Sequence, residues 1–190
     1  GELGYDNADP FGYDPDKALE LLAEAGYPDG FSMGMACPAG AYTNFEEVCE
    51  AIAGYFGGVG IDVELEIMES GQYWDLEAAK ELPPLFGDSW SATGMEAYRR
   101  LVGALGGMDA SYSSWEDEKI LSMLDEIKST VDQEERAKLY GDLQTYMRED
   151  PPFVYLYEPF TFEAINTRVQ KYTPRAAETY FLFETFVVEE

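Results

Sequence analysis

Hydrophobic and polar residues change from a helical to a strand periodicity within the first forty residues. Apolar side chains recur at helical spacing after Asp14 and Pro15, two residue types typical of a helix start. Gly26 ends that pattern, as glycine often does just after a helix. The apolar run 31–37 then predicts a buried strand. The apolar stripe of the helix consists of Ala18, Leu21, Leu22 and Ala25.

A second helix and a second strand follow. Asn44 stands before a helical pattern, and we expect it to cap the helix. Four residues are expected to face inward because they share one side of that helix: Val48, Ala51, Ile52 and Tyr55. Segment 61–68 alternates strictly between apolar and polar residues and is the clearest strand in the chain.

A third pair of elements completes this part of the pattern. Ser70 is expected to cap a helix that ends near Glu81, and segment 83–90 suits a strand with two prolines at its entrance. The repeated order of strand and helix predicts an α/β fold with right-handed crossovers. Its sheet is expected to consist of 31–37, 61–68 and 83–90, with helices flanking it.

The pattern becomes helical from Met95 onward. Two capping boxes, Ser114-x-x-Asp117 and Asp132-x-x-Glu135, each predict the start of a helix. The residues expected to be buried along the three helices of this region are Tyr98, Leu101, Val102, Leu105, Ile120, Leu124, Ile127, Leu139, Leu143 and Met147. Further strands are expected at 153–158, 160–165 and 180–188.

The charge balance excludes some partners. The chain has 38 acidic and 12 basic residues, for a formal net charge of −26. Nucleic acid and anionic membranes would repel such a chain. The acidity is explained either by a hydrated surface suited to salty surroundings or by attraction of a cationic ligand. We favour the first explanation because the acidic residues are spread over every predicted helix.

Other residue types limit the chemistry further. Histidine is absent, which excludes imidazole acid–base catalysis and zinc motifs that need histidine. We expect no metal site and no cofactor. Cys37 and Cys49 are the only cysteines, and either a disulfide or two free thiols fits them; we favour free thiols. No apolar run reaches about 18 residues, so no transmembrane helix is expected, and the first residues show no signal-peptide pattern.

Several motifs resemble one family and occur in the order that this family uses. The ordered set covers residues 13–175. It resembles the family 5 extracellular solute-binding proteins, the peptide, nickel and opine receptors of ABC importers. The segments that carry the resemblance are 13–30, 47–52, 60–65, 90–94, 109–113, 134–140 and 149–157, among them Gly60-Ile61-Asp62-Val63-Glu64-Leu65 and Trp90-Ser91-Ala92-Thr93-Gly94.

The resemblance implies a periplasmic-binding-protein-like lobe rather than a complete receptor. Residues 1–159 would form the C-terminal ligand-binding lobe, and residues 160–190 would return toward a missing N-terminal lobe of the same receptor. Such a receptor closes on a peptide-like or other small solute and presents it to an ABC permease. Its location would be periplasmic or extracellular, with a cell-surface lipoprotein as one form.

The resemblance also implies where a ligand would bind. By position, the ligand-facing loop of the family falls on Trp90, Ser91 and Thr93. Peptide receptors commonly have aspartate where Thr93 stands, and one subgroup has arginine where Ala41 stands, so we expect a solute other than an ordinary free peptide. Ligands of open α/β sheets lie beyond the carboxyl ends of the strands, which adds Asn44 and Tyr73 as neighbours of that loop.

Two further residues are candidates with competing structural roles. Asp88 could accept a hydrogen bond from a cationic solute, although a role in a turn is the simpler interpretation. Tyr112 could contact ligand or could lie in the core or at its rim.

Two other classes of function compete with a receptor. One is a carboxylate-based extracellular hydrolase such as a glycosidase, which needs two carboxylates about 5–9 Å apart in a cleft. The other is a structural or adaptor domain. Among 38 acidic residues, carboxylate pairs arise by chance, and the serine-elbow, P-loop and dinucleotide-binding motifs are absent from the sequence.

Overall fold

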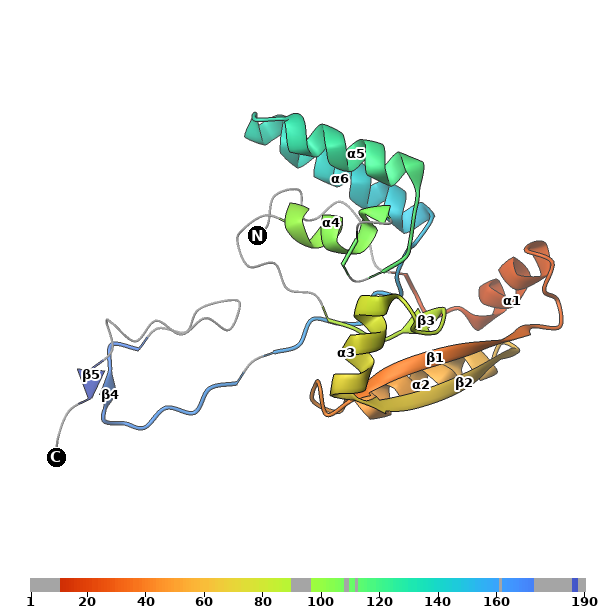
Figure 1. The fold of residues 1–190 in the computed structure, drawn as a ribbon, viewed down its shortest axis with the longest axis horizontal. Helices are drawn as coiled ribbons and strands as arrows, with labels where there is room; N and C mark the ends of the chain where they lie inside the picture. Colours follow the sequence, from red (N-terminus) through yellow and green to blue (C-terminus); the bar gives the residue numbers. More distant parts are fainter. Residues whose placement is uncertain are drawn as a thin grey trace.

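A computed structural model describes residues 11–89, 97–107, 110–111, 113–160, 162–172 and 186–187. Figure 1 shows a sheet with nearby helices, a second group of helices, and a long extended segment that leads away from both. The elements are α1 (Pro15–Glu24), β1 (Phe31–Ala39), α2 (Phe45–Gly57), β2 (Ile61–Glu69), α3 (Ser70–Ala79), β3 (Leu85–Phe86), α4 (Tyr98–Leu105), α5 (Glu118–Ser129), α6 (Gln133–Glu149), β4 (Val169–Gln170) and β5 (Phe186–Val187).

The first three strands form one parallel sheet in the order β2-β1-β3. β1 and β2 pair along their whole length, from Phe31 opposite Ile61 to Ala39 opposite Glu69. The predicted α/β class and the three strand positions are confirmed, but β3 is only two residues long and does not fill the predicted segment 83–90. The two prolines at the entrance of that segment carry no backbone N–H, which removes donors that a longer ladder would need.

Helices α2 and α3 cover opposite faces of the sheet. Met35 and Cys37 of β1 face α2, where they pack against Phe45. Ala36 lies between them in sequence and faces α3, where it packs against Tyr73. This alternation is the two-residue period of a strand whose two faces are both covered.

Local hydrogen bonds explain where several helices begin. The side chain of Asp14 accepts from Lys17 N–H at 2.9 Å, as predicted. Asp132 likewise accepts from the N–H groups of Glu134 and Glu135, at 3.0 and 2.9 Å. These interactions satisfy donors that have no partner within the helix.

Three of the predicted caps differ from the structure. Asn44 is the residue before α2, but it has a left-handed backbone with φ of 55° and its side chain accepts no capping hydrogen bond. Glu69, not Ser70, caps α3, because its carboxylate reaches Gln72 N–H at 3.1 Å. Asp117, not Ser114, caps α5 by accepting from Ile120 N–H at 2.8 Å.

Helix α2 buries a face slightly different from the predicted one. Phe45 and Cys49 are its buried residues, with Val48 and Ile52 partly buried beside them. Ala51 is exposed and Tyr55 is 65% exposed, so neither faces the sheet as predicted. The ring of Tyr13, a residue that precedes α1, contacts the Tyr55 ring edge-on, with the ring centroids 5.9 Å apart.

Helices α4, α5 and α6 pack together around their own core. Ile120, Leu124 and Ile127 of α5 are buried as predicted. On α6, Leu143 and Met147 are buried, whereas Tyr140 takes the buried place expected for Leu139, which is only partly buried. The other buried members are Ala104 and Leu105, and Tyr98, Leu101 and Val102 pack partly buried against them.

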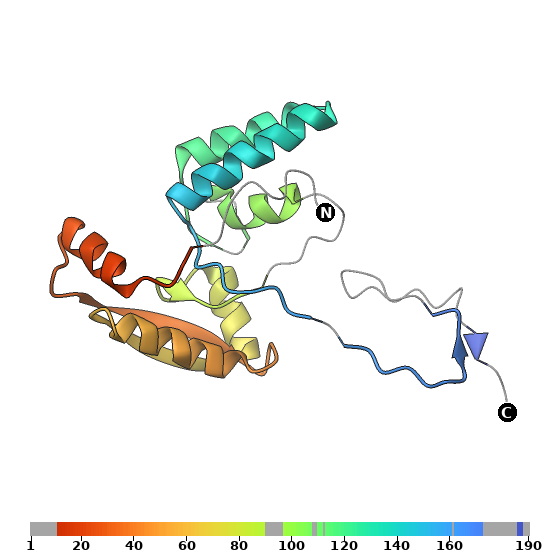
Figure 2. The same ribbon diagram turned by 180° about the vertical axis from the view of Figure 1, so that it is seen from behind.

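The described residues of segment 153–165 form no strand, contrary to prediction. Its described residues run as extended chain away from the packed helices in both views (Figures 1 and 2). Phe160 is 87% exposed and Phe162 is 92% exposed. Strand propensity produces a strand only where another strand supplies hydrogen bonds, and none pairs with this segment among the described residues. Of the predicted strand 180–188, Phe186 and Val187 form β5, which pairs antiparallel with β4; residues 180–185 and 188 lie outside the described residues.

Cys37 and Cys49 form a disulfide, which corrects the expectation of free thiols. Cys37 lies near the end of β1 and Cys49 on the second turn of α2, and both are fully buried. The packing of α2 on the sheet brings their Cα atoms to 6.5 Å, which is within bridging range. The sequence spacing alone could not reveal this approach.

Candidate ligand-binding site at the carboxyl edge of the sheet

The three parallel strands end at one edge of the sheet, so the segments that follow them meet there. The loop 40–44 follows β1, α3 follows β2, and the loop 87–89 follows β3. Asn44, Tyr73 and Asp88, three of the predicted site residues, belong to these segments. This edge is where open α/β sheets bind ligands, so we take it as the candidate site.

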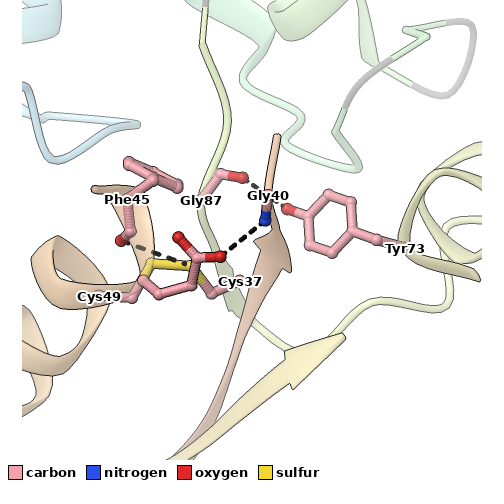
Figure 3. Close-up of a disulfide and its surroundings, with 7 residues drawn as sticks. Cys37, Gly40, Phe45, Cys49, Tyr73 and Gly87 are labelled. Carbon is pink, nitrogen blue, oxygen red and sulfur yellow. Dashed lines mark hydrogen bonds between the residues drawn. A yellow bond between two sulfur atoms is a disulfide. The ribbon is translucent and has the colours of Figure 1, made fainter. Parts of the chain in front are cut away.

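Tyr73 supports the loop after β3. Its ring is fully buried and packs edge-on against Trp74, with the ring centroids 4.9 Å apart. Its hydroxyl donates a hydrogen bond of 2.7 Å to the carbonyl of Gly87, as Figure 3 shows. Burial raises the pKa of the Tyr73 hydroxyl above its ordinary value, so it stays a neutral donor. In this structure Tyr73 therefore positions the loop, and its predicted contact with a ligand stays a prediction.

Asp88 links that loop to the loop after β1. Its Oδ1 accepts a hydrogen bond of 2.8 Å from the Tyr42 hydroxyl and one of 2.6 Å from the backbone N–H of Ser89. Burial raises the pKa of Tyr42 to about 12, which keeps its proton available for Asp88. Asp88 thus has the structural role in a turn that we considered simpler, and contact with a cationic solute stays a prediction.

Glu77 is a member of this group that the sequence analysis missed. It lies one turn after Tyr73 on α3 and within hydrogen-bonding reach of Asp88. Burial, followed by the negative charge of Asp88, raises the pKa of the Glu77 carboxyl to about 7. The one sequence signal was its i, i+4 spacing from Tyr73, which places both on the same side of the helix.

The disulfide holds the start of α2 against β1 at the base of the site. Figure 3 shows Cys37 and Cys49 beside Phe45 and close to Gly87. A Cβ added to Gly87 would lie 2.6 Å from the Phe45 ring and 3.6 Å from Cys49 Sγ. Glycine is therefore required at this position by the close approach of the loop to α2.

A hydrogen bond fastens the loop after β1 to the same helix. The backbone N–H of Gly40 donates to the Glu46 carboxylate at 2.7 Å. This interaction lowers the pKa of Glu46 below its ordinary value, because the donor stabilises the charged carboxylate. The loop after β1 is thus anchored by the Gly40–Glu46 hydrogen bond, and the loop after β3 by the Tyr73–Gly87 hydrogen bond.

A small cavity is lined by residues of α3 and of the segment before α5. Its volume is about 30 Å³, and its lining residues are Glu77, Lys80, Leu82, Phe86, Ser113 and Ser114. This space suits a water molecule and is far smaller than the roughly 300 Å³ of a typical ligand pocket. The cavity therefore cannot hold a solute by itself.

The predicted ligand-facing loop and Tyr112 stay predictions. Trp90, Ser91, Thr93 and Tyr112 lie outside the described residues. Asn44 is exposed at the start of α2. Within the described ranges, no group of three or more potential ligands could hold a metal ion, and no helix is long and apolar enough to cross a membrane.

Comparison with known proteins identifies the class. The profile described as "Bacterial extracellular solute-binding proteins, family 5 Middle" matches residues 2–111. The chain therefore belongs to the family 5 bacterial extracellular solute-binding proteins, which confirms the resemblance drawn from the motifs.

Individual relatives show how much of such a protein the chain represents. The heme-binding protein A of Haemophilus influenzae is 27% identical over 174 residues, which are 88% of this chain and 31% of that protein. The dipeptide-binding protein of Escherichia coli is 27% identical over 179 residues, which are 89% of this chain and 33% of that protein. The chain spans about a third of the length of these relatives.

A solved structure supports the fold. The periplasmic binding protein DppA of Helicobacter pylori, solved in complex with the peptide STSA, is 27% identical with a TM-score of 0.68. The match covers 80% of this chain and 30% of that one. The periplasmic-binding-protein-like α/β fold is thereby confirmed.

Proposed function

We propose that this chain is the second lobe of the substrate-binding component of an ABC importer. The complete receptor captures a small solute between two lobes and delivers it to the permease. The observation that carries the proposal is the convergence of three parallel strand ends in a member of this family, where Asn44, Tyr73 and Asp88 follow the strands.

In this proposal a second lobe completes the site, because the described residues at the edge of the sheet form one wall of it. The cavity of about 30 Å³ is too small for a solute, so affinity must come from closure of another lobe over the edge of the sheet. Residues 1–159 form the lobe in this proposal, and residues 160–190 return toward the N-terminal lobe of the same receptor. Exposed aromatic residues such as Phe160 and Phe162 support the return segment, because exposed apolar surface of this kind is normally covered.

The solute in this proposal is peptide-like or another small molecule, and not an ordinary free peptide. Thr93 supplies a hydroxyl where peptide receptors have a carboxylate, so an ammonium group would have no charged partner there. Oδ1 of Asp88 does not replace that carboxylate freely, because it already accepts from Tyr42 and Ser89. Relatives named for heme and for dipeptides indicate that this family accommodates solutes of different chemistry.

The receptor works outside the cytoplasm, in the periplasm or at the cell surface. The buried Cys37–Cys49 disulfide supports this location, because such bonds form and persist in oxidising compartments. Binding without catalysis is the proposed activity. A receptor is favoured over a glycosidase because the relatives that the chain matches are named as binding proteins.

Calorimetry on the full-length receptor tests the predicted ligand-facing loop. Trp90→Ala should weaken solute binding by about 1–3 kcal/mol, the scale expected when an aromatic ring is removed from a desolvated site. Tyr27→Ala is the matched control, since Tyr27 is a half-exposed aromatic residue before the amino end of β1, opposite the candidate site. Equal affinity in the Trp90 variant and in the control would remove Trp90 from the site.

A further inference from the structure

Helix α3 and the loop after β3 meet through the Tyr73–Gly87 hydrogen bond of 2.7 Å and through apolar packing. Glu77 lies one turn after Tyr73 and Asp88 directly follows Gly87, so the two carboxyls are neighbours across this junction. Glu77 belongs to α3, and Asp88 belongs to the loop that follows β3. Apolar residues of α3 and Phe86 of β3 pack on the same side of the sheet. Asp88 lies in one of the loops that form the candidate site, and Glu77 lies in the helix that packs beside it.

Hydrogen-bond geometry indicates which carboxyl carries a proton. Oδ1 of Asp88 already accepts hydrogen bonds from both Tyr42 and Ser89. Oε1 of Glu77 is buried and has no hydrogen-bond partner among the described residues. Leaving a charged oxygen in that state would be unfavourable, and a second negative charge beside Asp88 would add repulsion.

We propose that Glu77 and Asp88 share one proton and form a pH-sensitive latch between α3 and the loop after β3. In the closed latch, the protonated Glu77 carboxyl donates to the Asp88 carboxylate. When the proton leaves to solvent, two negative charges face each other and the hydrogen bond is broken. The direct link between the two carboxyls is then replaced by repulsion, and the apolar packing remains.

The surroundings of Glu77 set the pH at which the latch opens. The titratable groups around it are Asp88, Tyr73 and Lys80, which lines the same cavity; Tyr42 lies on the other side of Asp88, to which its hydroxyl donates. Burial and the charge of Asp88 dominate, and they raise the pKa of Glu77 to about 7. The adjacent cavity has room for a water molecule, which can solvate the carboxylate once it is charged.

The latch follows from the carboxyl pair alone and does not depend on the proposed receptor function. If that function is correct, the latch would loosen the loop that leads into Trp90 as the pH rises above about 7. The experiments measure titration and stability, so the latch can fail while the receptor proposal stands, and the reverse also holds.

Carbon-13 NMR of the side-chain carboxyls in the 190-residue chain tests the latch. The Glu77 signal should titrate with a midpoint near 7, and Asp88→Asn should lower that midpoint by at least about one pH unit. A Glu77 midpoint between about 4 and 5 in the parent chain, the range of an ordinary glutamate, would overturn the proposal.

Thermal unfolding of a second variant tests the latch without relying on the folding of Asp88→Asn. The unfolding midpoint of the parent chain should fall by about 3–6 °C between about pH 5 and about pH 8.5. Glu77→Gln should remove this fall. Asp75→Asn is the matched control, because Asp75 is an exposed acid on the same helix. The control should keep the pH dependence of the parent, and identical profiles for the two variants would contradict the latch.

Discussion

Removal of the Cys37–Cys49 disulfide should destabilise the sheet and α2 by an amount that the structure allows us to calculate. The bond joins residues 12 apart in sequence. In the chain-entropy account, closing a loop of this length lowers the entropy of the unfolded chain and stabilises the fold by about 3 kcal/mol. For a chain of this size, that free energy corresponds to a fall of about 6–12 °C in the unfolding midpoint.

The perturbation is best made in two ways. Reduction leaves two thiols in the same buried space, so it reports the effect of the crosslink. Cys37→Ala with Cys49→Ala also removes two sulfur atoms from the core, and we expect it to cost a further 1 kcal/mol or so, about the effect of a small cavity. Urea unfolding of the oxidised, reduced and alanine forms provides the three free energies of unfolding.

The reactivity of the bond provides a second assay. Because both sulfur atoms are fully buried, reduction and alkylation should occur only after α2 opens from the sheet. Native protein should therefore react slowly with reductant, and urea should accelerate the reaction. Rapid reduction without unfolding, or equal stability of the oxidised and reduced forms, would refute this account of the core.

Three further changes test other parts of the structure. Gly87→Ala should destabilise the chain by about 1–3 kcal/mol in urea unfolding, because its Cβ would lie 2.6 Å from the Phe45 ring; a neutral effect would show that the loop does not pack tightly on α2. Asp117→Ala should cost about 1 kcal/mol by removing the α5 cap, and unchanged stability would contradict that role. Glu77→Gln should stabilise the chain by about 1–2 kcal/mol above pH 7 and have little effect below pH 4.5, because the folded-state pKa is raised from 4.5 to about 7 and stability is lost as pH rises through that interval. The full difference in the pKa of Glu77 would correspond to about 3 kcal/mol, but solvent screening reduces this value because the residue is partly exposed. A destabilising effect of Glu77→Gln at high pH would show that the fold favours the charged carboxylate.

Features decided by neighbouring residues could be predicted from the sequence. The caps at Asp14 and Asp132 depend on donors two or three residues away, and both are present. The strict alternation in Ile61–Met68 likewise marked β2, because strand periodicity is visible in the residues themselves. The order of such elements was sufficient for the α/β class.

Features decided by tertiary contacts could not be predicted in the same way. Segment 153–165 has the composition of a strand, but pairing requires a neighbouring strand that composition does not reveal. The disulfide depends on how α2 packs on β1, and the unusual proton affinity of Glu77 depends on its burial beside Asp88. Within the candidate site, the sequence placed Asn44, Tyr73 and Asp88 after the correct strands, but the supporting role of Tyr73 required knowledge of its burial.

We propose that this chain is one lobe of a two-lobed solute receptor. The most direct test of this proposal is calorimetric titration of the solute into the full-length receptor and, separately, into the 190-residue chain. We predict measurable binding to the receptor and an affinity at least about a hundredfold weaker for the isolated chain, because only one wall of the site is then present. Equal affinity in the two proteins would contradict the two-lobed account.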